Sequence, residues 1–223
     1  MASALGRKRG LMIAAVLFII SAVGSAYPEM GFPHGAPHTF LTQFIIYRII
    51  GGVGVGLASM LSPMYIAEMA PASRRGGLVA WNQFAIIFGM LVVYFVNYFI
   101  ALNGDEAWLT STGWRLMFLS EVIPAALLFL LVLGVPESPR WLIMKGREAK
   151  AVAILERING APEAEVEAQS IRRSLHGTVK AKLFSYGVGV IVIGMLLSVF
   201  QQFIGINVVL YYAPEIFRNM GMG

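Results

Sequence analysis

Residues 40–67 have the sequence FLTQFIIYRIIGGVGVGLASMLSPMYIA, in which Arg48 is the only charged side chain. A helix that crosses the hydrocarbon core of a bilayer needs about 17–25 mostly apolar residues, so this stretch is long enough to span a membrane. Hydrophobic residues make up 57% of the chain and charged residues only 13%, too little charge to cover a soluble domain of this length. Four further apolar stretches lie at residues 11–26, 77–102, 114–135 and 183–217. The sequence therefore predicts an all-α polytopic membrane protein with five spans, the last of which is long enough to break at Gly205 or Pro214.

Lysine and arginine alternate between the segments that connect these stretches. Basic residues precede the first span, separate the second from the third, and recur through residues 136–182, whereas residues 27–39 and 103–113 contain none. Because loops rich in lysine and arginine stay in the cytoplasm, we expect a cytoplasmic N-terminus and an outward-facing C-terminal end. The basic residues sit at helix ends rather than in one patch, which argues against a nucleic-acid partner despite the net charge of +5.

The first apolar stretch, residues 11–26, also has the features of a cleavable signal peptide. Three basic residues, Arg7 to Arg9, precede it, and small residues end it. A cleaved leader does not explain the four later spans. We therefore favour a membrane span at this position.

The basic interval at residues 136–182 is predicted to be a folded cytoplasmic linker. Ser138 can cap a helix that has Pro139 at its first position. Residues 148–158 have the pattern of a short amphipathic helix, which Asn159 and Gly160 would end. Residues 162–175 have that of another, with acidic residues early and arginines late, as the helix dipole favours.

Two ionisable residues lie inside apolar spans, where their cost makes them functional candidates. Arg48 is in the second span and Glu121 is in the fourth. Both spans run from outside to inside, so at 1.5 Å per residue both side chains lie roughly 10–12 Å below the outer edge. The equal depth allows an ion pair, either one that takes part in proton coupling or one that only holds two helices together.

Neutral amides form a second candidate set, composed of Gln83, Gln201, Gln202 and Asn207. An amide both donates and accepts hydrogen bonds, which suits a sugar whose hydroxyls do the same. The last three do not share one face of a regular helix, but unwinding near Gly205 would let them converge in mid-membrane. The alternative is that these amides only bond neighbouring helices.

Other motifs lead to no site. The glycine run at 51–56 lacks the spacing of a dinucleotide-binding loop and lies inside a span, so helix packing explains it better. His34 and His38 are next to prolines that argue against the helix needed to align them for a metal. The chain has no cysteine, and we find no nucleophile–base pair, so we expect neither an enzyme nor a cofactor.

Several motifs together resemble the sugar porter family of the major facilitator superfamily. They are Gly6-Arg7-Lys8, YRIIGG at 47–52, PMYIAE at 63–68, Arg75-Gly76, PESPRWL at 136–142, QQFIGIN at 201–207 and YYAP at 211–214. The stretch NQFAIIFG at 82–89 is similar to a branch of that family, the bacterial D-xylose–proton symporters. The resemblance covers essentially the whole chain and implies residence in a bacterial inner membrane, with a monosaccharide and protons as partners.

The family's architecture implies a partial major facilitator fold containing helices three to seven of twelve. Residues 1–135 would belong to the N-terminal six-helix half, residues 136–182 would form the cytoplasmic helical linker, and residues 183–223 would hold the first helix of the C-terminal half. The family's first helix, with its coupling carboxylate, and helices eight to twelve have no counterpart in this sequence. We therefore expect the chain alone not to transport.

By matching positions, the resemblance also assigns roles. The sugar site would be lined by Gln83, Gln201, Gln202, Asn207 and Tyr211. Arg48 and Glu121 would belong to the proton-coupling network. A cytoplasmic charge cluster that holds the two halves together would contain Arg7, Lys8, Glu68, Arg75, Glu137 and Arg140, unless these charges form only a solvated collar. The leading function is proton-coupled sugar symport; the alternatives are a passive facilitator, or a non-transporting membrane protein such as a decayed gene product or a sugar sensor.

Overall fold

The computed structural model describes residues 2–30, 39–71, 73–176 and 188–221. These residues form two compact units, Met1–Leu175 and His176–Gly223, which we describe one at a time. Among the described residues every regular element is a helix. Four of the helical segments are long and apolar enough to cross a membrane.

The first unit contains all four of these long segments. A short α1 (Ala2–Leu5) leads into α2 (Arg7–Ala26), which is followed by α3 (Thr39–Met69) and α4 (Arg75–Ala101). The fourth segment, Glu106–Gly134, is made of α5 (Glu106–Trp108), a π-helical turn η1 (Leu109–Gly113), α6 (Trp114–Ser120) and α7 (Val122–Gly134). The predicted spans correspond to these helices, although the last begins eight residues earlier than the predicted Trp114.

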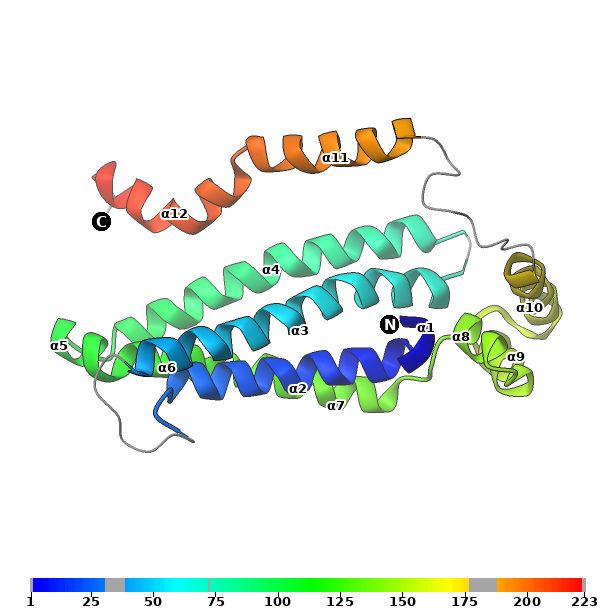
Figure 1. Ribbon diagram of the computed structural model, residues 1–223, viewed down its shortest axis with the longest axis horizontal. Helices are drawn as coiled ribbons and strands as arrows, with labels where there is room; N and C mark the ends of the chain where they lie inside the picture. The colour runs from blue at the N-terminus through cyan, green and yellow to red at the C-terminus, as the bar shows by residue number, and fades with distance from the viewer. Residues whose placement is uncertain (1, 31–38, 72, 177–187, 222–223) are drawn as a thin grey trace. The chain divides into compact units, whose positions relative to one another are not determined.

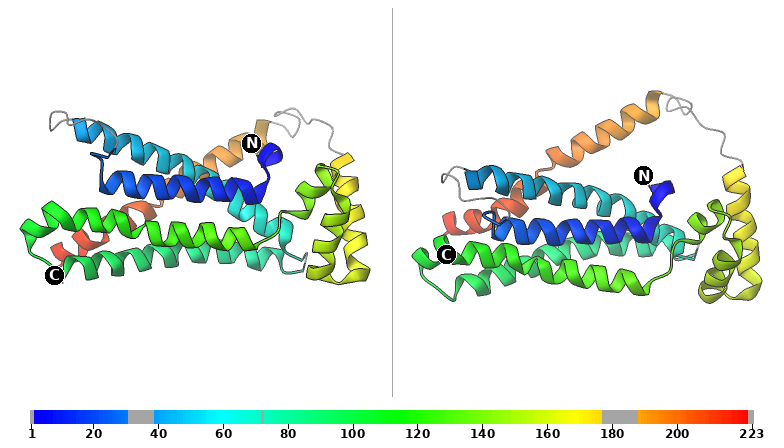
Figure 2. Two further views of the ribbon diagram at one scale, coloured as in Figure 1. Left: turned by 90° about the horizontal axis from the view of Figure 1, so that it is seen from below. Right: turned by 60° about the horizontal axis from the view of Figure 1, so that its bottom comes forward.

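Helix α2 lies between α3 and α7, as Figure 2 shows. It packs on α3 along one side and on α6 and α7 along another. Small residues make the approach to α3 close: a methyl group added at Gly51 would meet the Ser21 hydroxyl, and one added at Gly24 would meet the Tyr47 ring. Gly51 and Gly54 of the glycine run therefore serve helix packing, as the position of the run inside a span predicts, while nothing lies within 4 Å of Gly52 or Gly56.

The segment Glu106–Gly134 is interrupted twice. The π-helical turn η1 adds a residue to one turn of the helix, and a second break separates α6 from α7 at Glu121. Pro124 explains the second break, because it has no N–H to donate to the carbonyl of Ser120 four residues earlier. Helix α6 is thus a seven-residue piece with an irregular turn at each end.

The basic interval forms three helices at the end of the bundle where α2 begins (Figure 1). They are α8 (Pro139–Met144), α9 (Glu148–Asn159) and α10 (Ala161–His176). The Ser138 hydroxyl accepts a hydrogen bond from the backbone N–H of Trp141 with Pro139 at the first helical position, as predicted. Gly160, at φ 87°, ends α9 where the sequence placed its stop. Trp141, Leu142 and Leu155 join Ala164 and Ala168 in a small apolar core.

In the second unit the last predicted span is broken, as its length predicted. It consists of α11 (Val188–Phe203) and α12 (Ile206–Asn219), each shorter than a membrane crossing requires. The break falls at Gly205, which adopts a left-handed φ of 74° that favours glycine. The alternative break at Pro214 is wrong, since α12 continues through that position. Residues 183–187, the predicted start of this span, lie outside the described part of the chain.

Candidate functional site

The structure brings Arg48 and Glu121 together from α3 and the junction of α6 with α7. A guanidinium nitrogen of Arg48 (Nη1) lies 3.9 Å from Glu121 Oε2, and the side chains are 49% and 45% exposed within the described chain. The guanidinium carbon also lies 5.3 Å from the ring centroid of Phe118, close enough for a cation–π contact. The break at Pro124 places Glu121 at a helix end, while Arg48 projects from an unbroken helix.

The Arg48–Glu121 pair opens onto a cavity of about 260 Å³. Phe18 and Ser21 of α2 and Gly51, Gly52 and Val55 of α3 complete its lining. Charged groups at half exposure in an otherwise apolar bundle are accessible to a proton and to a further polar partner. Chemically, the pair can exist as an ion pair, or as a protonated acid beside a free guanidinium.

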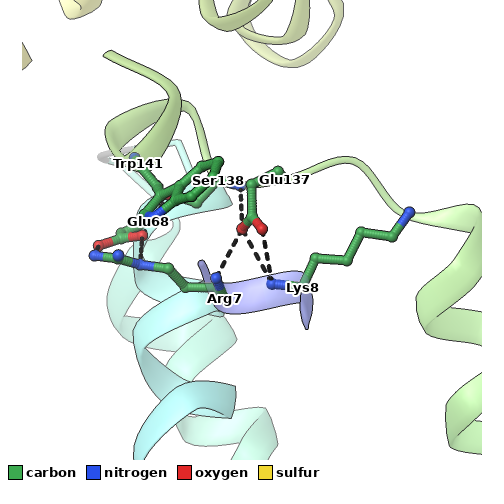
Figure 3. A network of polar contacts seen from close by, with 6 residues as sticks. All are labelled: Arg7, Lys8, Glu68, Glu137, Ser138 and Trp141. Atoms are coloured by element: carbon green, nitrogen blue, oxygen red, sulfur yellow. Dashed lines mark hydrogen bonds and ion pairs between the residues drawn. The ribbon is translucent and has the colours of Figure 1, made fainter. Parts of the chain in front are cut away.

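A second set of charges lies where α2 begins, and Figure 3 shows it from close by. Arg7 donates from Nε to Glu68 Oε2 at 2.8 Å and from Nη2 to Glu68 Oε1 at 2.7 Å, which is a two-pronged ion pair. The two side chains are 9% and 12% exposed. The Ser138 hydroxyl donates to the same carboxylate at 2.5 Å. Glu68 therefore joins the start of α2 and the cap of α8 to the end of α3.

Glu137 occupies the amino end of α2. Its carboxylate accepts hydrogen bonds from the backbone N–H groups of Arg7 at 2.9 Å and Lys8 at 3.0 Å, and from that of Ser138 at 3.0 Å (Figure 3). The first N–H groups of a helix have no partner inside it. A negative charge at this end also interacts favourably with the positive end of the helix dipole. Glu137 thus caps α2 from a distant part of the sequence.

At the carboxyl end of α7 and just beyond it, side-chain donors bond to backbone carbonyl groups. The Lys8 ammonium group donates to the carbonyl of Leu133 at 2.8 Å, and the Tyr65 hydroxyl donates to the carbonyl of Pro136 at 2.8 Å. The Lys8 side chain therefore neutralises a helix carboxyl end rather than an acidic residue. We use the name α2 clamp for the set Arg7, Lys8, Glu68, Glu137 and Ser138.

The other two predicted cluster residues lie beside this clamp. Arg75 is the first residue of α4, and its Nη2 atom lies 3.5 Å from Oε1 of Glu167 in α10. Arg140 lines a cavity of about 270 Å³ together with Glu68, Arg75 and Glu167. The guanidinium of Arg140 forms no ion pair with any acidic group of the described residues.

The predicted sugar-binding residues are divided between the two units. Gln83 is exposed on α4, next to a row of aromatic contacts formed by Trp81, Phe84 and Phe88. Gln201 and Gln202 lie in the last turn of α11, and the exposed Tyr211 lies in α12. The side chain of Asn207 is outside the described part of the chain. The convergence of these groups stays a prediction.

The sequence analysis missed several polar residues at these places. Ser138 was assigned only a capping role, and Glu167 and Tyr65 were given none. Arg115 and Glu29 form an ion pair at the end of α2 that was not anticipated either. A signal for Arg115 was present, because it is a charged residue just inside the predicted fourth span. His34 and His38 fall outside the described residues.

Comparison with known proteins gives one consistent result. A family model described as "Sugar (and other) transporter" matches residues 1–223. The D-xylose-proton symporter of Escherichia coli K12 is 58% identical over 226 residues, covering 97% of this chain and 46% of the relative. The glucose facilitated diffusion protein of Zymomonas mobilis is 36% identical and covers 98% of this chain and 46% of its own length.

A solved structure agrees in fold as well as in sequence. It is described as the major facilitator superfamily proton:xylose symporter bound to 6-bromo-6-deoxy-D-glucose, and it superposes with a TM-score of 0.90 at 57% identity. The match covers 100% of this chain and 49% of that one. The chain thus spans about half the length of the relatives it matches.

The long apolar helices and the helical linker define a multi-pass membrane protein with a partial major facilitator fold. Within that class, the chain belongs to the sugar transporter family.

Proposed function

We propose that this chain contributes to a proton-coupled monosaccharide symporter of the inner membrane, with D-xylose or a related sugar as substrate, that works by alternating access. The observation that carries the proposal is the ion pair between Arg48 and Glu121 inside otherwise apolar helices. A passive sugar pore has no need of a titratable group at that depth, whereas a symporter must bind and release a proton. The name of the relative that is 58% identical supports the same function.

The orientation follows from the charge distribution. With the α2 clamp and helices α8–α10 in the cytoplasm, the linkers rich in arginine and lysine stay inside, and residues 27–39 and 103–113 face outward. The end of the bundle with Glu29 is then the outer end. Glu121 and Arg48 lie between it and the membrane centre.

The mechanism we infer uses the two states of the pair. While Glu121 is ionised, it is held to Arg48 across 3.9 Å. A proton that enters the adjacent cavity neutralises Glu121 and releases Arg48 to another partner, which changes the balance between the transporter's two orientations. The two amide sets, Gln83 and Gln201 with its neighbours, would hold the sugar hydroxyls meanwhile.

The α2 clamp and its neighbours would stabilise one of those orientations. Arg75 and Arg140 border a cavity at the cytoplasmic end, so they can reach acidic groups of the C-terminal half when the two halves close there. The two-pronged bond between Arg7 and Glu68 is already formed within the N-terminal half. The Arg7–Glu68 bond therefore stabilises the N-terminal half rather than its contact with the C-terminal half.

The direct test is a chimera in which this chain replaces the segment it matches in the E. coli D-xylose-proton symporter. In proteoliposomes, we expect an inside-alkaline pH difference to drive accumulation of D-xylose above the outside concentration, and a protonophore to abolish it. The unaltered E. coli protein is the control. A folded chimera that shows no flux of sugar would contradict a role in sugar transport.

Passive facilitation is a second candidate, favoured by the 36% identity to a protein named for facilitated diffusion of glucose. The same chimera separates the two functions. A facilitator would equilibrate D-xylose at a rate that does not depend on the pH difference. A symporter would concentrate the sugar.

Replacing Gln83 with alanine in the chimera should weaken sugar binding. The variant would lose about one or two hydrogen bonds to a sugar hydroxyl and leave that hydroxyl unsatisfied, which corresponds to roughly a tenfold increase in Kd. Isothermal titration with D-xylose measures this. Asn103→Ala is the matched control, because Asn103 just beyond the end of α4 uses its amide to bond the carbonyl of Phe99. Equal affinities for the two variants would remove Gln83 from the sugar site.

A further inference from the structure

Arg115 joins the outer end of α2 to α6 through several contacts. Its Nη1 atom donates to Glu29 Oε1 and to the carbonyl of Ala26, the latter at 3.3 Å. Ala26 is the last residue of α2, where carbonyl groups have no helical donor and a positive charge is favourable. The guanidinium carbon also lies 5.0 Å from the ring centroid of Trp114 and 5.6 Å from that of Tyr27. We name this set of contacts around Arg115, Glu29 and Ala26 the Arg115 latch.

A line of contacts runs from the latch to Glu121. Arg115, Phe118 and Glu121 are spaced three residues apart, which places them on one face of α6 and its end. The Phe118 ring packs edge-on against Phe44 of α3, with centroids 5.5 Å apart, and it also lies under the guanidinium of Arg48. The last member of the face, Glu121, is the partner of Arg48.

Helix α6 needs such contacts to hold its orientation. The π-helical turn η1 precedes it and the break at Pro124 follows it, so seven residues are joined to the rest of the span by irregular turns. A change of rotation in so short a piece would move Glu121 off the face that meets Arg48. The side chains of this face therefore decide where the carboxylate points.

We propose that Arg115 and Glu29 are positioning residues for proton coupling, because their ion pair fixes the rotation of α6 and thereby holds Glu121 opposite Arg48. This inference rests on the proposed symport function and adds residues to it. The contacts of Arg115 and Glu29 in the described part of the chain include neither Arg48 nor Glu121, so both act through α6. The latch lies at the outer end of the bundle, away from the α2 clamp.

The charge state of the latch is compatible with this role. Burial raises the pKa of the Glu29 carboxyl, but a hydrogen bond from Arg115, one from the backbone N–H of Glu29 itself and the Arg115 charge together outweigh it. The pKa of Glu29 therefore lies below its usual value. Because the folded-state pKa is lowered, the contribution of the pair is present above the ordinary carboxyl pKa and is lost only as the pH falls through the lowered one. The latch therefore keeps its charges at neutral pH.

The test compares two kinds of transport in the chimera. Accumulation of D-xylose driven by a pH difference requires proton coupling, whereas exchange of labelled for unlabelled D-xylose at equal pH requires only sugar binding and alternating access. Glu29→Gln removes the ion pair with little change in size. We expect it to lower the accumulation ratio about threefold to fivefold, the range set by a partly exposed ion pair, and to leave exchange within about twofold.

Three further variants complete the design. Arg115→Lys keeps a charge near Glu29 but loses the planar group that reaches two acceptors and two rings, so it should retain part of the accumulation. The accumulation ratio of the double variant Glu29→Gln with Arg115→Gln should be no lower than that of the more impaired single variant, since both residues act through one ion pair. Glu165→Gln is the matched control, because its half-exposed carboxylate pairs with Arg172 of α10, outside the bundle.

The outcomes separate this inference from the proposed function. If the unaltered chimera does not accumulate sugar with a pH difference, the symport function itself is contradicted. If it does, but Glu29→Gln matches Glu165→Gln in accumulation, the positioning role is wrong. If accumulation and exchange fall together in Glu29→Gln and in Arg115→Lys, the latch only maintains the bundle, and the inference is again overturned.

Discussion

Replacing Arg48 with alanine should abolish the accumulation of D-xylose against its gradient while sparing exchange. The variant removes the only charged group that the described residues place against Glu121, 3.9 Å away, together with its contact to the Phe118 ring. A carboxylate without a counter-charge is costly inside an apolar span, so the neutral acid is favoured throughout the cycle. A group that keeps its proton cannot couple proton movement to sugar movement.

The measurement is the ratio of inside to outside D-xylose in proteoliposomes at an imposed pH difference. We expect that ratio to fall to about one, because an acid that stays protonated carries no net proton across the membrane with the sugar. Arg48→Lys keeps the charge but loses the planar geometry of the guanidinium. Its accumulation ratio should lie between those of the unaltered chimera and Arg48→Ala. Arg157→Ala, on the exposed face of α9, is the control for loss of an arginine. Sustained accumulation in Arg48→Ala would exclude Arg48 from the coupling network.

Replacing Arg7 with alanine should be the most destabilising single change in the α2 clamp. Both Arg7 and Glu68 are about nine-tenths buried. Of the polar contacts to the Glu68 carboxylate given above, the variant leaves only the one from the Ser138 hydroxyl. Breaking a buried ion pair by removing one partner costs roughly 3–5 kcal/mol, since a charge then stays buried without compensation. We expect a clear drop in the thermal midpoint of the chain in detergent.

Trp141, one of the four tryptophans of the chain, lies beside this network (Figure 3), and the combined tryptophan fluorescence can follow unfolding. The informative companion is the double variant Arg7→Met with Glu68→Leu, which removes both charges and should recover much of the lost stability. A double variant as unstable as Arg7→Ala would show that the carboxylate is needed for reasons other than its pairing with Arg7. A thermal midpoint for Arg7→Ala equal to that of Arg157→Ala would show that the clamp does not stabilise the bundle.

Hydropathy and charge spacing predicted most of the helices. The length of each apolar run, the proline after Ser138 and the glycine at position 160 are local signals, and the structure places helix ends where these signals fall. The start of the fourth segment was predicted too late, because Glu106 and the polar residues of η1 interrupt the apolar pattern although the backbone stays helical. The break in the last span was predicted from its length, but the choice between Gly205 and Pro214 depends on the backbone angle that Gly205 adopts.

The candidate sites were predictable in part. Arg48 and Glu121 stood out because charge in an apolar run is rare, and their similar depth followed from the rise of a helix. Lys8 was placed in a cluster of opposite charges, but its ammonium group meets a carbonyl at the end of α7. Backbone groups at helix ends are invisible in a residue pattern, so this partner could not be named in advance.

What the sequence determined by itself is the class of the protein: membrane helices in a fixed order, a helical linker and one titratable pair. These follow from composition and from periodicity, which are properties of neighbouring residues along the chain. Only the tertiary structure decided which polar groups meet. Glu137 caps a helix that begins 130 residues earlier, and Arg115 reaches back to the end of α2. Such partners are fixed by how the helices pack against one another.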